Sequence, residues 1–170
     1  MPLYDSAVQH LWAPWRMDFI KGSKPDGCFF CEAAAADPAR DPDLLVLART
    51  EQALAVLNRY PYNNGHLMVA PRAHLANLED LPISTATAVM ALTQRALRAV
   101  RQALKPDGFN LGINAGKIAG AGVADHVHQH VVPRWHGDTN FMPVVAQTKI
   151  VNEHLTKSYQ ELRAAFDHVS

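Results

Sequence analysis

Three histidines at alternate positions are the strongest chemical feature of the sequence. His126, His128 and His130 lie in a valine-rich segment, 126–135, whose pattern predicts a strand. Side chains alternate across a strand, so the three imidazoles would share one face at spacings of about 6–7 Å. A neutral imidazole has one N–H and one lone pair. If a carbonyl holds the N–H, the other nitrogen can attack phosphorus and form a covalent phosphoramidate.

Two other interpretations of the three histidines stay open. Histidines in an HxH pattern on a strand bind zinc, and the arrangement can also arise by chance. The preceding loop favours phosphate chemistry, because it contains Gly116, Gly120 and Gly122. Glycines let backbone N–H groups approach phosphate oxygens closely.

Cys28 and Cys31 are the only cysteines, and they form a CxxC motif. In a reducing compartment this spacing favours metal or redox chemistry over a structural disulfide. A zinc site would need two further ligands. A reduced pair without a ligand and a redox-active pair are the alternatives.

Composition narrows the class of protein. The 170 residues suggest one domain, and 48% of them are hydrophobic. Basic and acidic residues number 16 each, which gives no overall attraction to nucleic acid. No apolar run approaches the roughly 20 residues of a membrane span, and the first residues lack a signal-peptide layout. We therefore expect a cytoplasmic protein without nucleic-acid or membrane partners.

The elements that must position these groups follow from periodicity. Besides the histidine segment, alternation predicts strands at 44–50, 53–59, 66–71 and 109–114. The clearest helix covers 84–104, capped by Ser84 or Thr85 and ended by Pro106 and Gly108. A second helix is marked by Val151, Leu155, Tyr159, Leu162 and Phe166.

The N-terminal part is expected to be less regular. Residues 21–43 read as loop, apart from the CxxC and a short helical stretch at 32–36. The order of strands, helix, strands and helix, with short connections between strands, predicts an α+β fold with antiparallel pairing. We divide the single domain into 1–43, an arm and CxxC loop packed on the core, 44–146, and the C-terminal helix region 147–170.

Three ordered blocks resemble the histidine-triad (HIT) superfamily. They are Val56–Arg59 with Gly65–Leu67 downstream, Asn110–Asn114 with the glycine loop, and the three histidines. The flanking segments 11–17 and 133–142 look like the bacterial diadenosine tetraphosphate (Ap4A) phosphorylase-like branch. The resemblance implies a HIT-like fold: an antiparallel sheet of about five strands, a long central helix and a C-terminal helix. It also implies a homodimer or a higher homo-oligomer.

The same resemblance implies catalytic roles for the triad. His128 would be the nucleophile, His130 would contact the α-phosphate, and His126 would support the site. Substrate-binding roles fall on five further residues: Asn58 at the ribose, His66 near the nucleoside pocket, and Asn114, Gly120 and Gly122 at phosphate. A turn-adjacent polar residue remains the alternative for Asn58, and a structural hydrogen bond remains the alternative for His66.

The sequence departs from the family pattern at two places. Gln129 replaces an apolar residue, but it would lie on the strand face opposite the histidines, so little effect on chemistry is expected. The loop 119–124 lacks the serine or threonine that relatives often have. Phosphate contacts there would have to come from backbone N–H groups.

By resemblance, His74 and His126 would join Cys28 and Cys31 in a Cys2His2 zinc site. With four protein ligands such a site would be structural. No catalytic metal is implied, because the nearby acidic residues Asp125 and Asp138 are isolated in sequence.

The function implied is cleavage of Ap4A through a nucleotidyl-histidine intermediate, with inorganic phosphate as acceptor and ATP and ADP as products. Two alternatives stay open. One is a HIT hydrolase of dinucleoside polyphosphates or adenosine phosphoramidates. The other is a non-catalytic, nucleotide-binding zinc protein.

Overall fold

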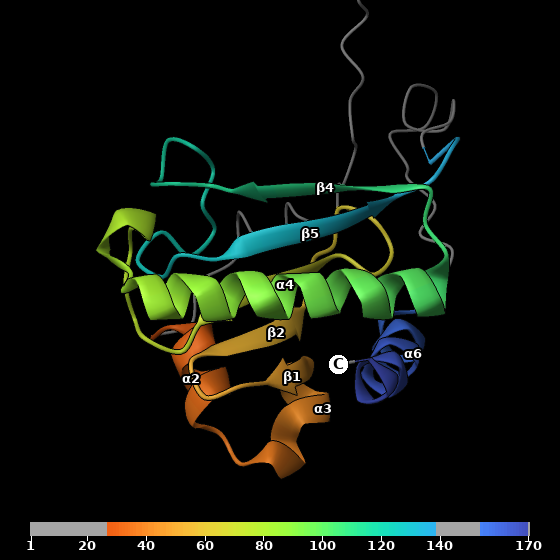
Figure 1. Ribbon diagram of the computed structural model, residues 1–170, viewed down its shortest axis with the longest axis horizontal. Coiled ribbons are helices and arrows are strands. Elements are labelled where there is room, and N and C mark those ends of the chain that lie inside the picture. The colour runs from red at the N-terminus through yellow and green to blue at the C-terminus, as the bar shows by residue number, and fades with distance from the viewer. Residues whose placement is uncertain (1–26, 139–153, 170) are drawn as a thin grey trace, which may run out of the picture.

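The computed structural model describes residues 27–138 and 154–169, and it shows an α+β fold. Its sheet has the strand order β1-β2-β3-β5-β4, and each neighbouring pair is antiparallel (Figure 1). The strands are β1 (Val46–Arg49), β2 (Ala53–Leu57), β3 (Leu67–Pro71), β4 (Gly108–Ile113) and β5 (Gln129–Arg134). The expected fold class and the five-stranded antiparallel sheet are confirmed.

The long helix α4 (Ile83–Leu104) lies across the sheet and contacts β2, β3 and β5 (Figure 1). Its buried residues Val89, Leu92, Ala96 and Val100 recur at helical spacing, so one stripe of the helix faces the sheet. All five residues of β2 are buried, as expected for a strand covered on both faces. One part of the core therefore lies between α4 and the sheet, and residues outside both, such as Phe30 and Phe166, belong to the same cluster.

The C-terminal helix α6 (Leu155–His168) packs against α4 and β1. Arg95 of α4 holds the C-terminal end of α6, because its guanidinium donates to the carbonyls of Phe166 and Val169. Val151, which helped to predict this helix, lies outside the described residues. The three-part division of the chain stays a prediction.

The predicted cap of α4 is wrong. The residue before the helix is Pro82, no side chain caps the first turn, and Ser84 and Thr85 already lie inside the helix. The proline, whose φ is −54°, begins the helix from a fixed backbone angle. At the other end, Lys105 adopts a left-handed φ of 48°, and Gly108 opens β4 instead of ending the helix.

Within the described residues, the short helical stretch predicted at 32–36 lies in a helix as far as Ala35, but the loop expected on either side of it is wrong. Helix α2 (Phe29–Ala35) begins directly after Cys28, and a 3-10 turn (Pro38–Arg40) and α3 (Asp41–Leu44) follow. The alanines after Glu32 favour helix, and Pro38 and Pro42 occupy first-turn positions, where their missing N–H costs nothing.

The histidine strand is shorter than the predicted 126–135. β5 pairs with β3 and β4 only from Gln129 onward. Before that point, the Val127 N–H donates to the Leu75 carbonyl at 2.7 Å, so a loop fixes this segment instead of a ladder. Residues 126–129 are all buried, which differs from the simple alternation of a half-exposed strand.

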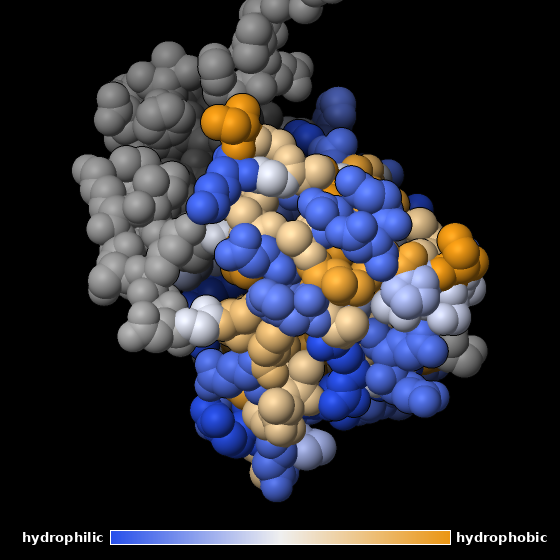
Figure 2. Space-filling view, turned by 90° about the vertical axis from the view of Figure 1, so that its left-hand side faces the viewer, coloured by the Kyte–Doolittle hydropathy of each residue, from blue (hydrophilic) through white to orange (hydrophobic). Residues whose placement is uncertain are grey.

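The face of the molecule on the α2 side mixes hydrophilic and hydrophobic residues, and the most hydrophobic ones form separate spots (Figure 2). None of the described helices is long and apolar enough to cross a membrane.

Candidate active site and metal centre

The imidazole of His128 lies just before β5 and is only 5% exposed. Its Nδ1 is 2.8 Å from the main-chain carbonyl of His126. A carbonyl only accepts hydrogen bonds, so Nδ1 carries the proton and Nε2 keeps its lone pair. Burial lowers the pKa of His128, and the bond to the carbonyl opposes that shift. The lowered pKa favours the neutral ring, which is the nucleophilic form.

Two rings fix the orientation of His128. The Phe30 centroid lies 5.0 Å away at 37°, and the His130 centroid lies 4.9 Å away at 74°. Phe30 is fully buried and also contacts the ring of His126 at 5.1 Å. The three triad histidines thus lie in a row, with Phe30 against two of them.

A chain of hydrogen bonds assigns the protons of His66 and His130. The Tyr62 N–H donates to His66 Nδ1 at 3.0 Å, so the His66 proton is on Nε2. That nitrogen lies 3.0 Å from His130 Nδ1 and donates to it. His130 therefore carries its own proton on Nε2. The ring of Tyr62 stacks on His66 at 5.0 Å and 12°, which holds the donor in place.

Asn58 is buried next to this chain. Its side-chain nitrogen lies 3.5 Å from His66 Nε2, and its Oδ1 accepts the Tyr60 N–H at 2.8 Å. The structure thus brings Asn58 and His66 together with His130. His66 also makes the structural hydrogen bonds that were the alternative interpretation for it, so the two interpretations do not exclude each other.

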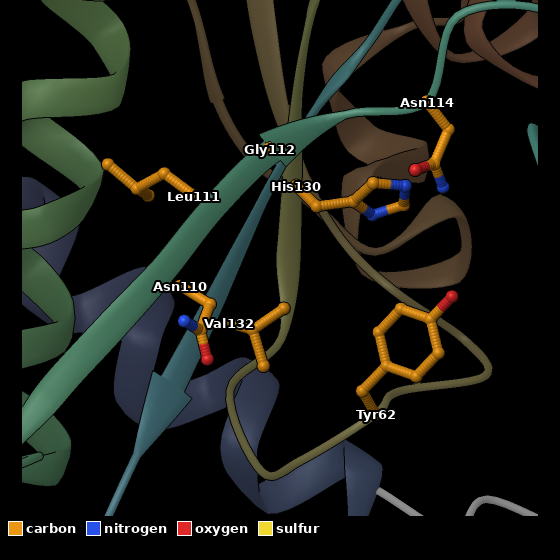
Figure 3. Close-up of a pocket in the computed structure, with 7 residues that line it drawn as sticks. All are labelled: Tyr62, Asn110, Leu111, Gly112, Asn114, His130 and Val132. Carbon is orange, nitrogen blue, oxygen red and sulfur yellow. The ribbon is translucent and has the colours of Figure 1, made fainter. Parts of the chain in front are cut away.

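A hollow of about 280 Å³ opens beside His130, on the face formed by β4 and β5. Tyr62, Asn114 and His130 lie at one end, with the tyrosine hydroxyl on the same side as the asparagine amide (Figure 3). Asn110, Leu111, Gly112 and Val132 complete the lining. Asn114 is thus close to the triad, as predicted.

The two glycines predicted to bind phosphate do not line this hollow. Gly120 is exposed at the surface of the loop, with a φ of +84°, and Gly122 is half-buried. Since a Cβ at Gly120 would meet nothing within 4 Å, its positive φ, and not a close approach, accounts for the glycine there.

Four side chains from distant parts of the chain form a candidate metal centre. The ligand atoms of Cys28, Cys31, His74 and His126 all lie within 4.8 Å of one another. Nδ1 of His126 lies 3.2 Å from Cys28 Sγ and 3.7 Å from Cys31 Sγ, and Nδ1 of His74 lies 3.2 Å from Cys31 Sγ. Tetrahedral zinc with typical bond lengths requires sulfur–nitrogen separations of about 3.5–3.6 Å. These residues could bind a metal: the three sulfur–nitrogen distances lie within about 0.4 Å of that separation, and two thiols with two imidazoles are a ligand set that suits zinc.

The orientation of His126 supports this fit. Its Nε2 lies 2.9 Å from the Pro71 carbonyl, so that nitrogen carries the proton and Nδ1 directs its lone pair toward the sulfurs.

Burial, followed by the hydrogen bond and charge of Cys28, raises the pKa of the Cys31 thiol. Two like thiols held together in this way are stabilised as thiolates by a cation.

Sequence reasoning missed two residues of the site. Phe30 lies inside the CxxC, and Tyr62 precedes the turn that ends at His66. The position of Phe30 between the two cysteines was a usable signal, because the CxxC fixes it beside the metal ligands. Nothing in its local sequence singled out Tyr62.

Comparison with known proteins shows the family of this chain. The profile of the HIT domain matches residues 41–137, which is more than half of the chain. The chain belongs to the HIT domain family. The AP-4-A phosphorylase of Mycobacterium tuberculosis is 40% identical over 154 residues, which cover 87% of this chain and 79% of that protein.

Other HIT relatives differ in what their names describe. A protein named Adenylylsulfatase HINT3, from Arabidopsis thaliana, is 30% identical over 71% of this chain and 64% of its own length. Among solved structures, a zinc-bound histidine triad family protein from Mycobacterium smegmatis is similar, with a TM-score of 0.66 and 32% identity. That match covers 84% of this chain and 94% of the other. It supports the HIT-like fold directly.

Proposed function

We propose that this HIT protein cleaves diadenosine tetraphosphate through a nucleotidyl-histidine intermediate, with inorganic phosphate as the acceptor. The observation that carries the proposal is the tautomer of His128. Its Nδ1–H is bound to the His126 carbonyl, which leaves Nε2 as a neutral nucleophile in a buried site.

In the first step, His128 Nε2 attacks one α-phosphorus of Ap4A. The bond from that phosphorus to the bridging oxygen breaks, and ATP leaves with the electron pair. The AMP group is then bonded to a ring that carries positive charge, and the His126 carbonyl stabilises that charge through the Nδ1–H. In the second step, a phosphate oxygen attacks the same phosphorus, which gives ADP and restores His128.

The proton arrangement of His130 supports a role at the phosphate. Because His66 donates to its Nδ1, its Nε2–H is the donor for a non-bridging oxygen of the reacting phosphorus. Asn114, at the same end of the hollow, provides a second polar group for phosphate. We assign Asn58 to the ribose and His66 to positioning of His130. Phosphate is not assigned to the loop glycines, because the Gly120 N–H donates to the Lys117 carbonyl at 3.0 Å and neither Gly120 nor Gly122 lines the hollow.

The relation to a protein named AP-4-A phosphorylase supports phosphate over water as acceptor. Product analysis tests this choice. Purified protein is incubated with Ap4A, with and without inorganic phosphate, beside a His128→Ala control. We expect ATP and ADP in the presence of phosphate only. ATP and AMP in both conditions would make the protein a hydrolase, and absence of turnover in both would refute Ap4A as substrate.

A second candidate is hydrolysis of adenylylated small molecules such as adenosine phosphoramidates. The similarity to a protein named Adenylylsulfatase HINT3 favours it, and the absence of a hydroxyl from the loop 119–124 keeps it open. The same assay with adenosine phosphoramidate separates the two, since release of AMP without any need for phosphate is expected only of the second.

Zinc is part of the proposal as a structural ion. Cys28, Cys31, His74 and His126 would hold it, and when bound it would supply a cross-link between α2 and the segment before β5. With four protein ligands it would have no position for substrate, so the reaction would proceed on the histidines alone.

We also propose that the protein forms a homodimer or a higher homo-oligomer. β4 lies at an edge of the sheet and leaves Leu111 47% exposed, and an exposed edge strand can pair with a strand of another copy. Light scattering after size exclusion tests this, and a mass of one chain at micromolar concentration would contradict it.

A further inference from the structure

The CxxC holds an aromatic ring against the proposed nucleophile. Phe30 is one of the two residues between Cys28 and Cys31, in the first turn of α2. Its fully buried ring lies 5.1 Å from the ring of His126 and 5.0 Å from that of His128. A constraint on the two cysteines therefore also constrains the Phe30 ring, against which His128 packs.

A second connection passes through His126. Its ring points Nδ1 at the sulfurs of the centre, while its main-chain carbonyl accepts the proton of His128 Nδ1 at 2.8 Å. The Pro71 carbonyl fixes the other nitrogen of the same ring. One residue therefore contributes its side chain to the metal centre and its backbone to the nucleophile.

We propose that the metal centre controls the orientation and tautomer of His128 through two positioning residues, Phe30 and His126. This inference rests on the proposed role of His128 as nucleophile. Metal loss, or oxidation of Cys28 and Cys31 by a disulfide-exchange partner, releases α2 and the His126 ring. His128 then loses its contact with the Phe30 ring and its hydrogen bond to the His126 carbonyl, which keeps the proton on Nδ1.

The substrate side of the site is also held by hydrogen bonds of its own. His130 is held by His66, which is held in turn by the Tyr62 backbone and ring, and none of the three is a ligand of the centre. Metal loss therefore lowers kcat, by about 10- to 100-fold as for other changes around metal ligands, while KM stays within about threefold.

The test compares the metal-loaded protein with chelated protein and with His74→Ala, which removes an exposed ligand that does not contact His128. Imidazole ¹H–¹⁵N NMR reports the tautomer of each histidine without any turnover. In both metal-free samples we expect the His128 signals to move toward the average of two tautomers, while those of His66, which Tyr62 holds, keep their shifts. Unchanged His128 signals after metal loss would overturn the proposal.

Two further variants separate positioning from general stability. Phe30→Leu keeps all four ligands, and we expect it to bind metal but to broaden or shift the His128 signals. Arg95→Met removes the bonds to the Phe166 and Val169 carbonyls, so it loosens the end of α6 and not α2. It should lower the melting temperature and leave the His128 signals in place; a shift as large as that of His74→Ala would refute the coupling.

The NMR result is independent of the substrate. If the metal-loaded protein does not cleave Ap4A but His128 responds to metal, the proposed function fails and the coupling stands. If it cleaves Ap4A and His128 does not respond, the coupling fails and the proposed function stands.

Discussion

His128 and His130 are two residues apart, yet their surroundings differ. His128 is enclosed by the Phe30 ring and by the His126 carbonyl. Phe30 lies between the two cysteines of the candidate metal centre, and His126 is one of its ligands. His130 lines an open hollow and is held by a hydrogen bond from the side chain of His66. The proposed nucleophile is thus fixed by apolar packing and backbone, while the proposed phosphate contact is fixed by polar side chains that face the hollow. The surroundings of His128 fix the orientation of its ring, and those of His130 leave room for a ligand.

Removal of the enclosed histidine should have the largest effect. We expect His128→Ala to lower kcat by at least about 10³-fold, because no other group replaces the covalent step. Nucleotide binding, measured by calorimetry, should remain within about threefold of the original protein, because the hollow is lined by His130 and not by His128. Retained turnover would remove the distinction between the two histidines.

His66→Ala tests the polar side. The variant removes the proton donated to His130 Nδ1, so His130 is free to turn its lone pair toward the phosphate. We expect kcat to fall by about 10²-fold in steady-state assays. His66→Gln, whose amide can donate to the same nitrogen, is the matched control and should recover part of the loss. Equal defects in both variants would argue that His66 acts only by its size.

Asn114→Ala tests whether the hollow holds phosphate. Loss of one hydrogen bond to a charged group costs about 1.5–3 kcal/mol, so KM for Ap4A should rise by about tenfold or more. Asn110 lines the other end of the hollow and accepts a bond from Arg134, so Asn110→Ala should change KM less. If Asn110→Ala has the larger effect, the phosphates lie at the opposite end.

Gln129→Leu should have the smallest effect on turnover. Gln129 lies between the two histidines but points to α4, where its side chain is 3.2 Å from the Thr93 hydroxyl. Since Thr93 also bonds to the Val89 carbonyl, its hydroxyl keeps a partner in the variant. We expect a stability change of about 1 kcal/mol by denaturant titration and kcat within about threefold. A large loss of kcat would show that this face of β5 also positions the histidines.

The sequence was sufficient to predict what depends on residue type and spacing. The α+β class and the antiparallel sheet follow from alternation and short connections, and the metal-ligand set Cys28, Cys31, His74 and His126 does converge in space. Assignment of His74 and His126 came from family resemblance, because ligands that are distant in sequence leave no local pattern.

What could not be predicted depends on tertiary contacts. The start of β5 at Gln129 is set by the Leu75 carbonyl, which holds Val127 away from the ladder. The start of α2 at Phe29 lies before the predicted stretch at 32–36, because short helices gain most of their stability from packing, here through Phe30. The tautomers of His66, His126 and His128 are set by backbone groups of Tyr62, Pro71 and His126, and no side-chain pattern encodes these contacts.

The most direct test of the account is to trap the intermediate. The metal-loaded protein is mixed with Ap4A in the absence of inorganic phosphate, quenched under alkaline conditions that preserve phosphoramidates, and digested for mass spectrometry. We predict an AMP adduct on His128, which disappears when phosphate is added before the quench. An adduct on His126 or His130, or turnover that proceeds without any adduct, would contradict the assignment of His128 as the nucleophile.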